Sequence, residues 1–199
     1  MRSRMVDGAR RHFFAHGFRG VTMDDLAAEL GVSKKTLYSR FESKTRLLEA
    51  VIDEQFRRVG EECLRITSDT EAGFPETLRG LTASMQRHTA EIQPPFIKDM
   101  RQEAPEIFQR VQRLRREHIH RFFGELMARG RKTGFIRKDV PPQVIIEILL
   151  GAVESILNPA RMEELGLTPK TGLEMIMKVV LEGAAAPGAR TQAETSSEK

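Results

Sequence analysis

The side chains best placed for recognition chemistry lie in one short run of basic and hydroxyl-bearing residues. Ser33 is a favourable N-cap, and Lys34, Lys35 and Thr36 would form the first turn of the helix that it starts. A helix that enters the major groove of DNA N-terminus first brings such residues to base edges and phosphates. The remaining outward positions of this helix are Tyr38, Ser39 and Arg40. The run predicts a DNA-recognition helix. Its Tyr38 side chain either contacts DNA or serves only in packing within the protein.

The residues around this run predict the elements that hold it in place. Thr22 can cap a preceding helix, with Asp25 three residues later in a capping-box arrangement. Gly31 can adopt the positive φ that a tight turn between two helices needs. Leu37 and Phe41, four residues apart, would hold the recognition helix against the core. Together these signals predict a helix-turn-helix.

Charge is concentrated in the same part of the chain. Residues 1–50 hold ten Lys and Arg against six Asp and Glu, whereas the other 149 residues hold 22 of each. A basic N-terminal segment favours a polyanionic partner, with double-stranded DNA as the leading candidate. Short apolar runs predict no transmembrane helix, and a single cysteine, Cys63, excludes an internal disulfide. We therefore expect a cytoplasmic protein without membrane association.

Helical periodicity dominates the rest of the chain and predicts an all-α fold of about nine helices. We expect three parts: a helix-turn-helix DNA-binding domain over 1–46, a helical effector-binding and dimerisation domain over 47–186, and a disordered tail over 187–199. The predicted fold is thus an N-terminal three-helix head joined to a larger helical body.

The head resembles the tetracycline-repressor (TetR) family. The matching run reads Thr22-x-x-x-Leu26-Ala27-x-x-Leu30-Gly31-Val32-Ser33-x-x-Thr36-Leu37-Tyr38-x-x-Phe41-x-Ser43-Lys44-x-x-Leu47-Leu48. The resemblance implies phosphate contacts by Thr22 and Lys44 and a phosphate or base contact by Tyr38. Arg40 and Thr45 depart from the pattern, because a His commonly precedes the Phe and an acidic residue commonly follows the Lys.

The resemblance also implies a homodimeric repressor that leaves a palindromic operator when a small, mostly apolar molecule binds the body. The walls that we expect for such a pocket are inward-facing residues: Met85, His88, Phe96, Met100, Val111, His118 and Phe122. The alternative for the apolar members is ordinary core packing. His88 and His118 are the more informative pair, since each interrupts an apolar stripe and either orients a polar group of the ligand or is a satisfied core residue.

The last two long helices are apolar on more than one side, which predicts that a partner subunit covers them. The residues that we assign to this dimer interface are Ile145, Leu149, Ala152, Val153, Ile156, Ile176, Met177 and Val180. Glu147 and Glu154, seven residues apart, are either charges at its rim or pocket acids for a cationic ligand.

A basic block in the body leaves another alternative open. It comprises Arg110, Arg113, Arg115, Arg116, Arg121, Arg129, Arg131 and Lys132. It is either a solvated face that balances acidic neighbours or an attractor for an anionic effector.

Other classes of function find less support in the sequence. The chain has no nucleophile elbow, phosphate loop or dinucleotide fingerprint, so we expect no enzymatic activity and no cofactor. His12 and His16, one helical turn apart, are expected to be surface residues, and no metal site is predicted. DNA compaction without sequence preference and a protein-binding adaptor remain the alternatives, and neither accounts for charge confined to one small unit.

Overall fold

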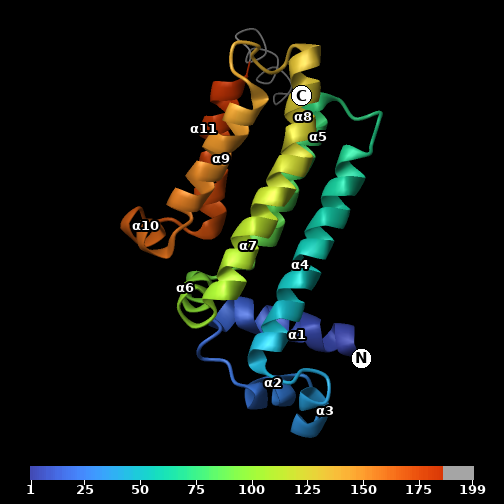
Figure 1. Cartoon of the computed structure of the whole chain (residues 1–199), viewed down its shortest axis with the longest axis vertical. Helices are drawn as coiled ribbons and strands as arrows, with labels where there is room; N and C mark the ends of the chain where they lie inside the picture. Colours follow the sequence, from blue (N-terminus) through green and yellow to red (C-terminus); the bar gives the residue numbers. More distant parts are fainter. Residues whose placement is uncertain (186–199) are drawn as a thin grey trace, which may run out of the picture. The chain divides into compact units, whose positions relative to one another are not determined.

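The computed structural model describes residues 1–185. Capping residues, prolines and glycines mark where its helices begin and end. The predicted tail over 187–199 lies outside the described residues. The fold is all-α, as predicted, and within 1–185 the only strand-like pairing is an isolated bridge between Ile136 and Ala185 (Figure 1). The elements are α1 (Arg2–His16), α2 (Met23–Glu29), α3 (Lys34–Tyr38), α4 (Lys44–Thr67), α5 (Phe74–Ala90), α6 (Pro94–Glu103), α7 (Pro105–His118), the π-helix η1 (Ile119–Phe123), α8 (Gly124–Thr133), α9 (Pro142–Ile156), α10 (Pro159–Glu164) and α11 (Pro169–Ala184).

The helix-turn-helix forms as the sequence predicts. Thr22 and Asp25 make a complete capping box at the start of α2, and the Ser33 side chain accepts from the backbone N–H of Thr36 at the start of α3. Gly31 has a φ of 62°, the left-handed conformation that the turn requires. Leu37 is fully buried on the inner side of α3. Local hydrogen bonding therefore fixes where α3 begins, and packing of Leu37 fixes which side faces outward.

The described chain forms two compact units. The first comprises residues 1–59 together with 88–114, and the second comprises residues 60–87 and 115–185. The boundary at residue 46/47 that we expect from the sequence is a functional division and stays a prediction.

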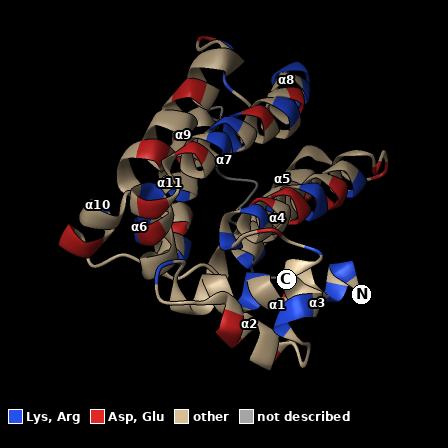
Figure 2. Ribbon diagram, turned by 60° about the horizontal axis from the view of Figure 1, so that its bottom comes forward, with Lys and Arg blue, Asp and Glu red and all other residues tan. Residues whose placement is uncertain are grey.

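In the first unit, α1 packs against both the helix-turn-helix and α6. The ring of Phe13 lies 5.5 Å from that of Phe18, and the ring of Phe14 lies 4.9 Å from that of Phe96 on α6. The backbone N–H of Gln93 donates to the carbonyl of Phe14 at 3.0 Å. Figure 2 shows Lys and Arg residues on α1 and α3, at the basic end of the chain.

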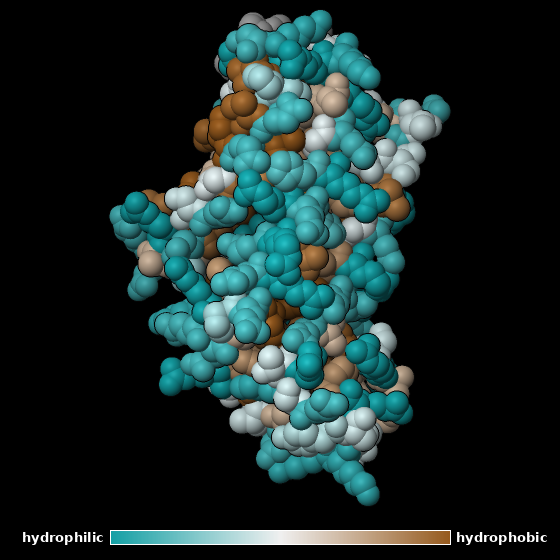
Figure 3. All heavy atoms as spheres, in the orientation of Figure 1, coloured by the Kyte–Doolittle hydropathy of each residue, from teal (hydrophilic) through white to brown (hydrophobic). Residues whose placement is uncertain are grey.

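Helices α7, η1 and α8 follow one another without a break, so that one π-helical turn interrupts a long helix. Residues 105–114 of this helix belong to the first unit and the remainder belongs to the second. The short α10 was not predicted from the sequence. Helices α9 and α11 pack side by side. Hydrophobic side chains gather on the surface over this pair, as Figure 3 shows; the large exposed apolar residues of the two helices are Val144, Ile148, Met175 and Val179.

No helix in residues 1–185 combines the length and the apolar character needed to span a bilayer.

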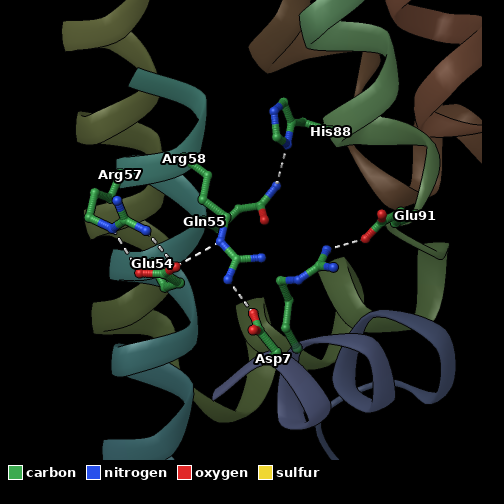
Figure 4. A network of polar contacts seen from close by, with 8 residues as sticks. Asp7, Glu54, Gln55, Arg57, Arg58, His88 and Glu91 are labelled. Atoms are coloured by element: carbon green, nitrogen blue, oxygen red, sulfur yellow. Dashed lines mark hydrogen bonds and ion pairs between the residues drawn. The ribbon is translucent and has the colours of Figure 1, made fainter. Parts of the chain in front are cut away.

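A chain of ion pairs joins α1 to α4 within the first unit (Figure 4). Arg58 donates to Asp7 on α1 and, through Nε at 2.7 Å, to Glu54 on its own helix. Arg57 donates to the same Glu54 carboxylate at 2.9 and 2.7 Å. The hydrogen bonds from Arg57 and then Arg58 lower the pKa of Glu54 to about 2. Glu54 therefore stabilises the fold as an anion, and it orients Arg58 toward α1.

We expect Glu54→Gln to destabilise the protein by about 1 kcal/mol at pH 7, because a neutral amide forms weaker hydrogen bonds to both guanidinium groups. The folded-state pKa lies below the ordinary value of 4.5. The stabilisation is thus complete above that value and is lost as the pH falls toward 2. Urea unfolding followed by far-ultraviolet circular dichroism, from pH 7 down to pH 2.5, measures the difference between the two proteins. Glu125→Gln, at an exposed site on α8, is the matched control. A Glu54→Gln difference that stayed constant over this range would contradict a role for the Glu54 charge.

Candidate functional site

The outward side of α3 is a polar surface presented by a buried framework. Lys34, Lys35, Ser39 and Arg40 are all exposed, and the Tyr38 side chain is 46% exposed. The only fully buried residue of α3 is Leu37. The structure therefore brings the predicted recognition residues together on one side of a short helix. That arrangement suits insertion into a major groove.

Two hydroxyl groups of this surface are engaged in holding α3 together. Ser33 Oγ lies 2.8 Å from Thr36 Oγ1 and accepts from the Thr36 backbone N–H at 3.0 Å. Ser39 Oγ donates to the Thr36 carbonyl at 2.8 Å. Ser33 and Ser39 thus have defined structural roles at the two ends of the helix, whatever contacts they make with DNA.

The two lysines at the start of α3 differ in their surroundings. Lys34 Nζ lies 2.5 Å from Asp24 Oδ2 on α2, and both side chains are largely exposed. Lys35 is exposed as well. A surface ion pair such as Lys34–Asp24 contributes little to stability, but it fixes the direction of the lysine and supplies a competitor to any DNA phosphate. The Asp24 contact could not be predicted from the sequence, because Asp24 and Lys34 are ten residues apart.

The structure does not favour the phosphate contact that we predicted for the Lys44 side chain. Its Nζ donates to the carbonyls of Phe18 at 2.9 Å and Val21 at 3.0 Å, with the Arg19 carbonyl at 3.5 Å. The ammonium also lies 4.4 Å from the centre of the Phe18 ring. An ammonium has three N–H donors, and these carbonyls account for them. Lys44 therefore ties α4 to the loop between α1 and α2.

Thr22, the other predicted phosphate contact, has an exposed side chain whose hydroxyl forms part of the capping box. Thr22 Oγ1 donates to Asp25 Oδ2 at 2.7 Å and accepts from the Asp25 backbone N–H at 3.1 Å. The hydrogen bonds from Thr22 lower the pKa of Asp25 below its ordinary value. Thr22 thus sets the start of α2, and its contact with DNA stays a prediction.

The predicted effector residues are divided between the two units. Phe96, Met100 and Val111 are buried in the apolar core of the first unit, where His88 is half-buried. The members in the second unit are Met85, His118 and Phe122. There the His118 and Phe122 rings lie 5.8 Å apart, and His118 Nε2 approaches Gly60 so closely that a Cβ would lie 3.1 Å from it. Each of these residues has packing contacts inside its own unit. Their joint role in binding an effector stays a prediction.

The predicted dimer interface requires a correction. Five of its residues are buried inside the second unit: Ile145, Leu149, Val153, Ile176 and Met177. They pack within the subunit and cannot also contact a partner. Ala152, Ile156 and Val180 remain half-buried. The apolar residues open to a partner are instead the exposed Val144, Ile148, Met175 and Val179.

Several members of the basic block have partners of opposite charge. Arg110 lies 2.5 Å from Asp53 in the first unit. In the second unit Arg116 lies 2.5 Å from Glu147 and 3.6 Å from Glu154. Burial lowers the pKa of Arg115. These contacts favour the reading of Glu147 and Glu154 as surface charges and of the block as a face that balances its acidic neighbours.

Other reactive groups do not assemble into a site. Burial raises the pKa of the Cys63 thiol to about 11, so that the thiolate is scarce at neutral pH. Nowhere in residues 1–185 do three or more His, Cys, Asp or Glu side chains gather in a way that would hold a metal ion. The His12 and His16 rings lie 4.7 Å apart near the end of α1 without a further ligand of this kind.

Known proteins share both the head and the whole architecture. Residues 5–51 match the family described as bacterial regulatory proteins, tetR family. The HTH-type transcriptional repressor AcnR of Corynebacterium efficiens is 28% identical over 158 residues, which cover 79% of this chain and 78% of the relative. SmeT, the repressor of the Stenotrophomonas maltophilia multidrug efflux pump SmeDEF, has a similar solved structure. It has a TM-score of 0.65 at 20% identity, over 95% of this chain and 92% of SmeT. A second solved structure, regulatory protein TetR from Rhodobacter sphaeroides, has a TM-score of 0.69 at 18% identity, over 90% and 96% of the two chains.

The family match covers the same residues that present α3, and the relative and the structural neighbours extend the likeness to the helical body. Residues 5–51 therefore form a DNA-binding domain of the TetR family, and the chain is similar in sequence to a transcriptional repressor and in fold to the regulatory protein TetR.

Proposed function

We propose that the protein is a ligand-responsive repressor that binds a two-fold symmetric operator as a homodimer and leaves it when a small, mostly apolar molecule binds. The observation that carries the DNA-binding part is the outward surface of α3, held by Leu37 and the Ser33 cap. Two subunits would present two copies of α3 to successive major grooves. A regulator of this kind works at the chromosome, so we place it in the cytoplasm.

The response to a ligand is supported by a structural neighbour. SmeT also has a solved structure with triclosan, a small molecule, at a TM-score of 0.63 to this chain. In the mechanism that we propose, the ligand lowers the population of the DNA-competent dimer because it binds another conformation more tightly. The effector, the operator and the regulated genes are to be found by experiment.

The experiment that tests the proposed function is selection of random duplex DNA by the purified protein at near-physiological salt, read by sequencing. We expect an enriched motif with approximate two-fold symmetry, because two identical recognition helices read two half-sites. A folded dimer that enriched no motif would contradict sequence-specific recognition and would favour the compaction or adaptor alternatives. The enriched motif then serves as the operator in the experiments that follow.

The two lysines Lys35 and Lys44 give opposite expectations for DNA binding. Lys35→Ala should change the selected sequence and lower the salt slope of binding by about one unit. Lys44→Met should destabilise the protein by about 1–3 kcal/mol, since three backbone carbonyls lose a charged donor. It should leave the selected sequence unchanged.

Fluorescence anisotropy against labelled operator at several salt concentrations, together with urea unfolding, separates these effects. A Lys44→Met protein of normal stability whose salt slope fell by a full unit would show that Lys44 contacts phosphate after all.

The exposed faces of α9 and α11 give a test of dimerisation. Ile148 is 56% exposed and Val179 is 71% exposed, and no side chain lies within reach of a Cβ placed at Gly151, one turn after Ile148. We expect Ile148→Glu and Val179→Glu each to shift the protein toward monomer, because a charge would be buried in an apolar contact. Light scattering after size-exclusion chromatography measures the mass. Leu165→Glu, at an equally exposed leucine next to α10, is the control that should remain dimeric. A dimer that survived both substitutions would place the interface elsewhere.

A further inference from the structure

One buried polar side chain of the first unit has an unused hydrogen-bonding atom. Gln55 on α4 is only 7% exposed, and Thr77 and Ser84 are the other polar side chains buried to this degree in the described part of the chain. The Gln55 Nε2 atom lies 3.3 Å from His88 Nδ1. Its Oε1 atom is buried and has no hydrogen-bond partner in residues 1–185. Figure 4 shows the amide nitrogen of Gln55 directed at His88 and the oxygen turned away from it.

The unpartnered Oε1 atom of Gln55 lies among apolar side chains. One turn earlier on α4, Val51 and Ile52 are buried members of the apolar core, and Phe56 packs against the same core. A polar atom left without a partner in such a place is costly, and native structures retain few of them. The hydrogen bond to His88 uses only the nitrogen end of the carboxamide, so it does not account for the unpartnered oxygen.

The charges near Gln55 are already paired with one another. Arg58 binds Asp7 and Glu54, and Arg10 binds Glu91. Arg10 keeps a buried Nε–H without a hydrogen-bond partner in residues 1–185, but Glu91 already matches the charge of its guanidinium group, so an anionic ligand group would compete with Glu91. A neutral group that forms a hydrogen bond would leave them intact.

We propose that Gln55 and His88 form the polar end of the effector site, and that the effector is an uncharged, mostly apolar molecule whose hydroxyl group donates to Gln55 Oε1. This inference rests on the proposed function, since it names the class of ligand that releases the repressor. A hydroxyl group both donates and accepts, so it satisfies the free end of the carboxamide in either of its two orientations. The apolar core residues around Gln55 would hold the remainder of the molecule.

The competing explanation is a buried water molecule that binds Gln55 permanently as part of the fold. The two explanations differ in what an apolar replacement does to the ligand-free protein. Gln55→Met breaks the hydrogen bond to His88 under either explanation. If Oε1 waits for a ligand, the change also removes an unsatisfied atom, and the midpoint of thermal unfolding stays within about two degrees of the wild-type value. If a water satisfies Oε1, the change breaks a second hydrogen bond as well, and the midpoint falls by more than about four degrees. Gln109→Met, at an exposed glutamine on α7 of the same unit, is the control that should change neither the midpoint nor ligand binding.

The second measurement uses matched probes that differ only in the polar group: 4-hexylphenol, 4-hexylanisole and 4-hexylbenzoate. We expect the wild-type protein to bind the phenol at least about tenfold more tightly than the anisole, which has no donor, or the benzoate, which is an anion. Calorimetry gives the affinities, and release of labelled operator gives the response. Gln55→Met should bind phenol and anisole equally.

The outcomes separate the inference from the function on which it rests. If the protein binds its operator but shows no preference for the phenol, or binds none of the three probes, the inference is overturned and DNA recognition stays intact. An unfolding midpoint for Gln55→Met more than about four degrees below that of the wild type would overturn it as well. Failure to select any DNA motif would instead overturn the proposed function.

Discussion

The first unit depends on one constraint: α1 must be covered on two sides. Phe13 and Phe14 are adjacent, and consecutive residues on a helix point about 100° apart. Phe13 therefore packs against Phe18 next to the helix-turn-helix, while Phe14 packs against Phe96 on α6. Neither side of α1 can be left open without exposing a large aromatic ring to water. For this reason the DNA-binding head is continuous with residues 88–114 in one compact unit.

This double coverage gives the proposed response a physical route. The segment around α6 holds α1 and the loop that follows it through polar contacts as well as aromatic packing. Asp99 accepts from the backbone N–H of Arg19 at 2.8 Å, and Glu91 binds Arg10. Gly17 has a φ of 85°, and a Cβ there would lie 2.5 Å from the Asp99 carboxylate. A shift of the segment that carries His88 would thus act on α1 directly.

The features that the sequence predicts well are the local ones. Capping residues and turn glycines act on backbone within a few residues, so Ser33 and Gly31 could be assigned without knowledge of the fold. Features that depend on contacts between residues far apart in the sequence could not be predicted in the same way. Helix α9 is apolar on several sides, and periodicity alone does not distinguish Ile145 and Leu149, which are buried in their own subunit, from Ile148, which is exposed. Gln55 carries no signal in the sequence, because an isolated polar residue beside an apolar stripe resembles a surface position.

The contacts that the basic residues of the head already make affect how this protein would distinguish one DNA sequence from another. Of the charges that the sequence offers to DNA, Lys44 is occupied by backbone carbonyls and Lys34 is paired with Asp24. The electrostatic attraction available to any DNA sequence is therefore smaller than the composition indicates. Lys34 must exchange a carboxylate for DNA, a trade that is favourable only where a phosphate or base edge is well placed. If the protein binds DNA through α3 as proposed, these two lysines add less to non-specific attraction than free lysines would, and the fit of α3 to a particular groove carries more of the recognition.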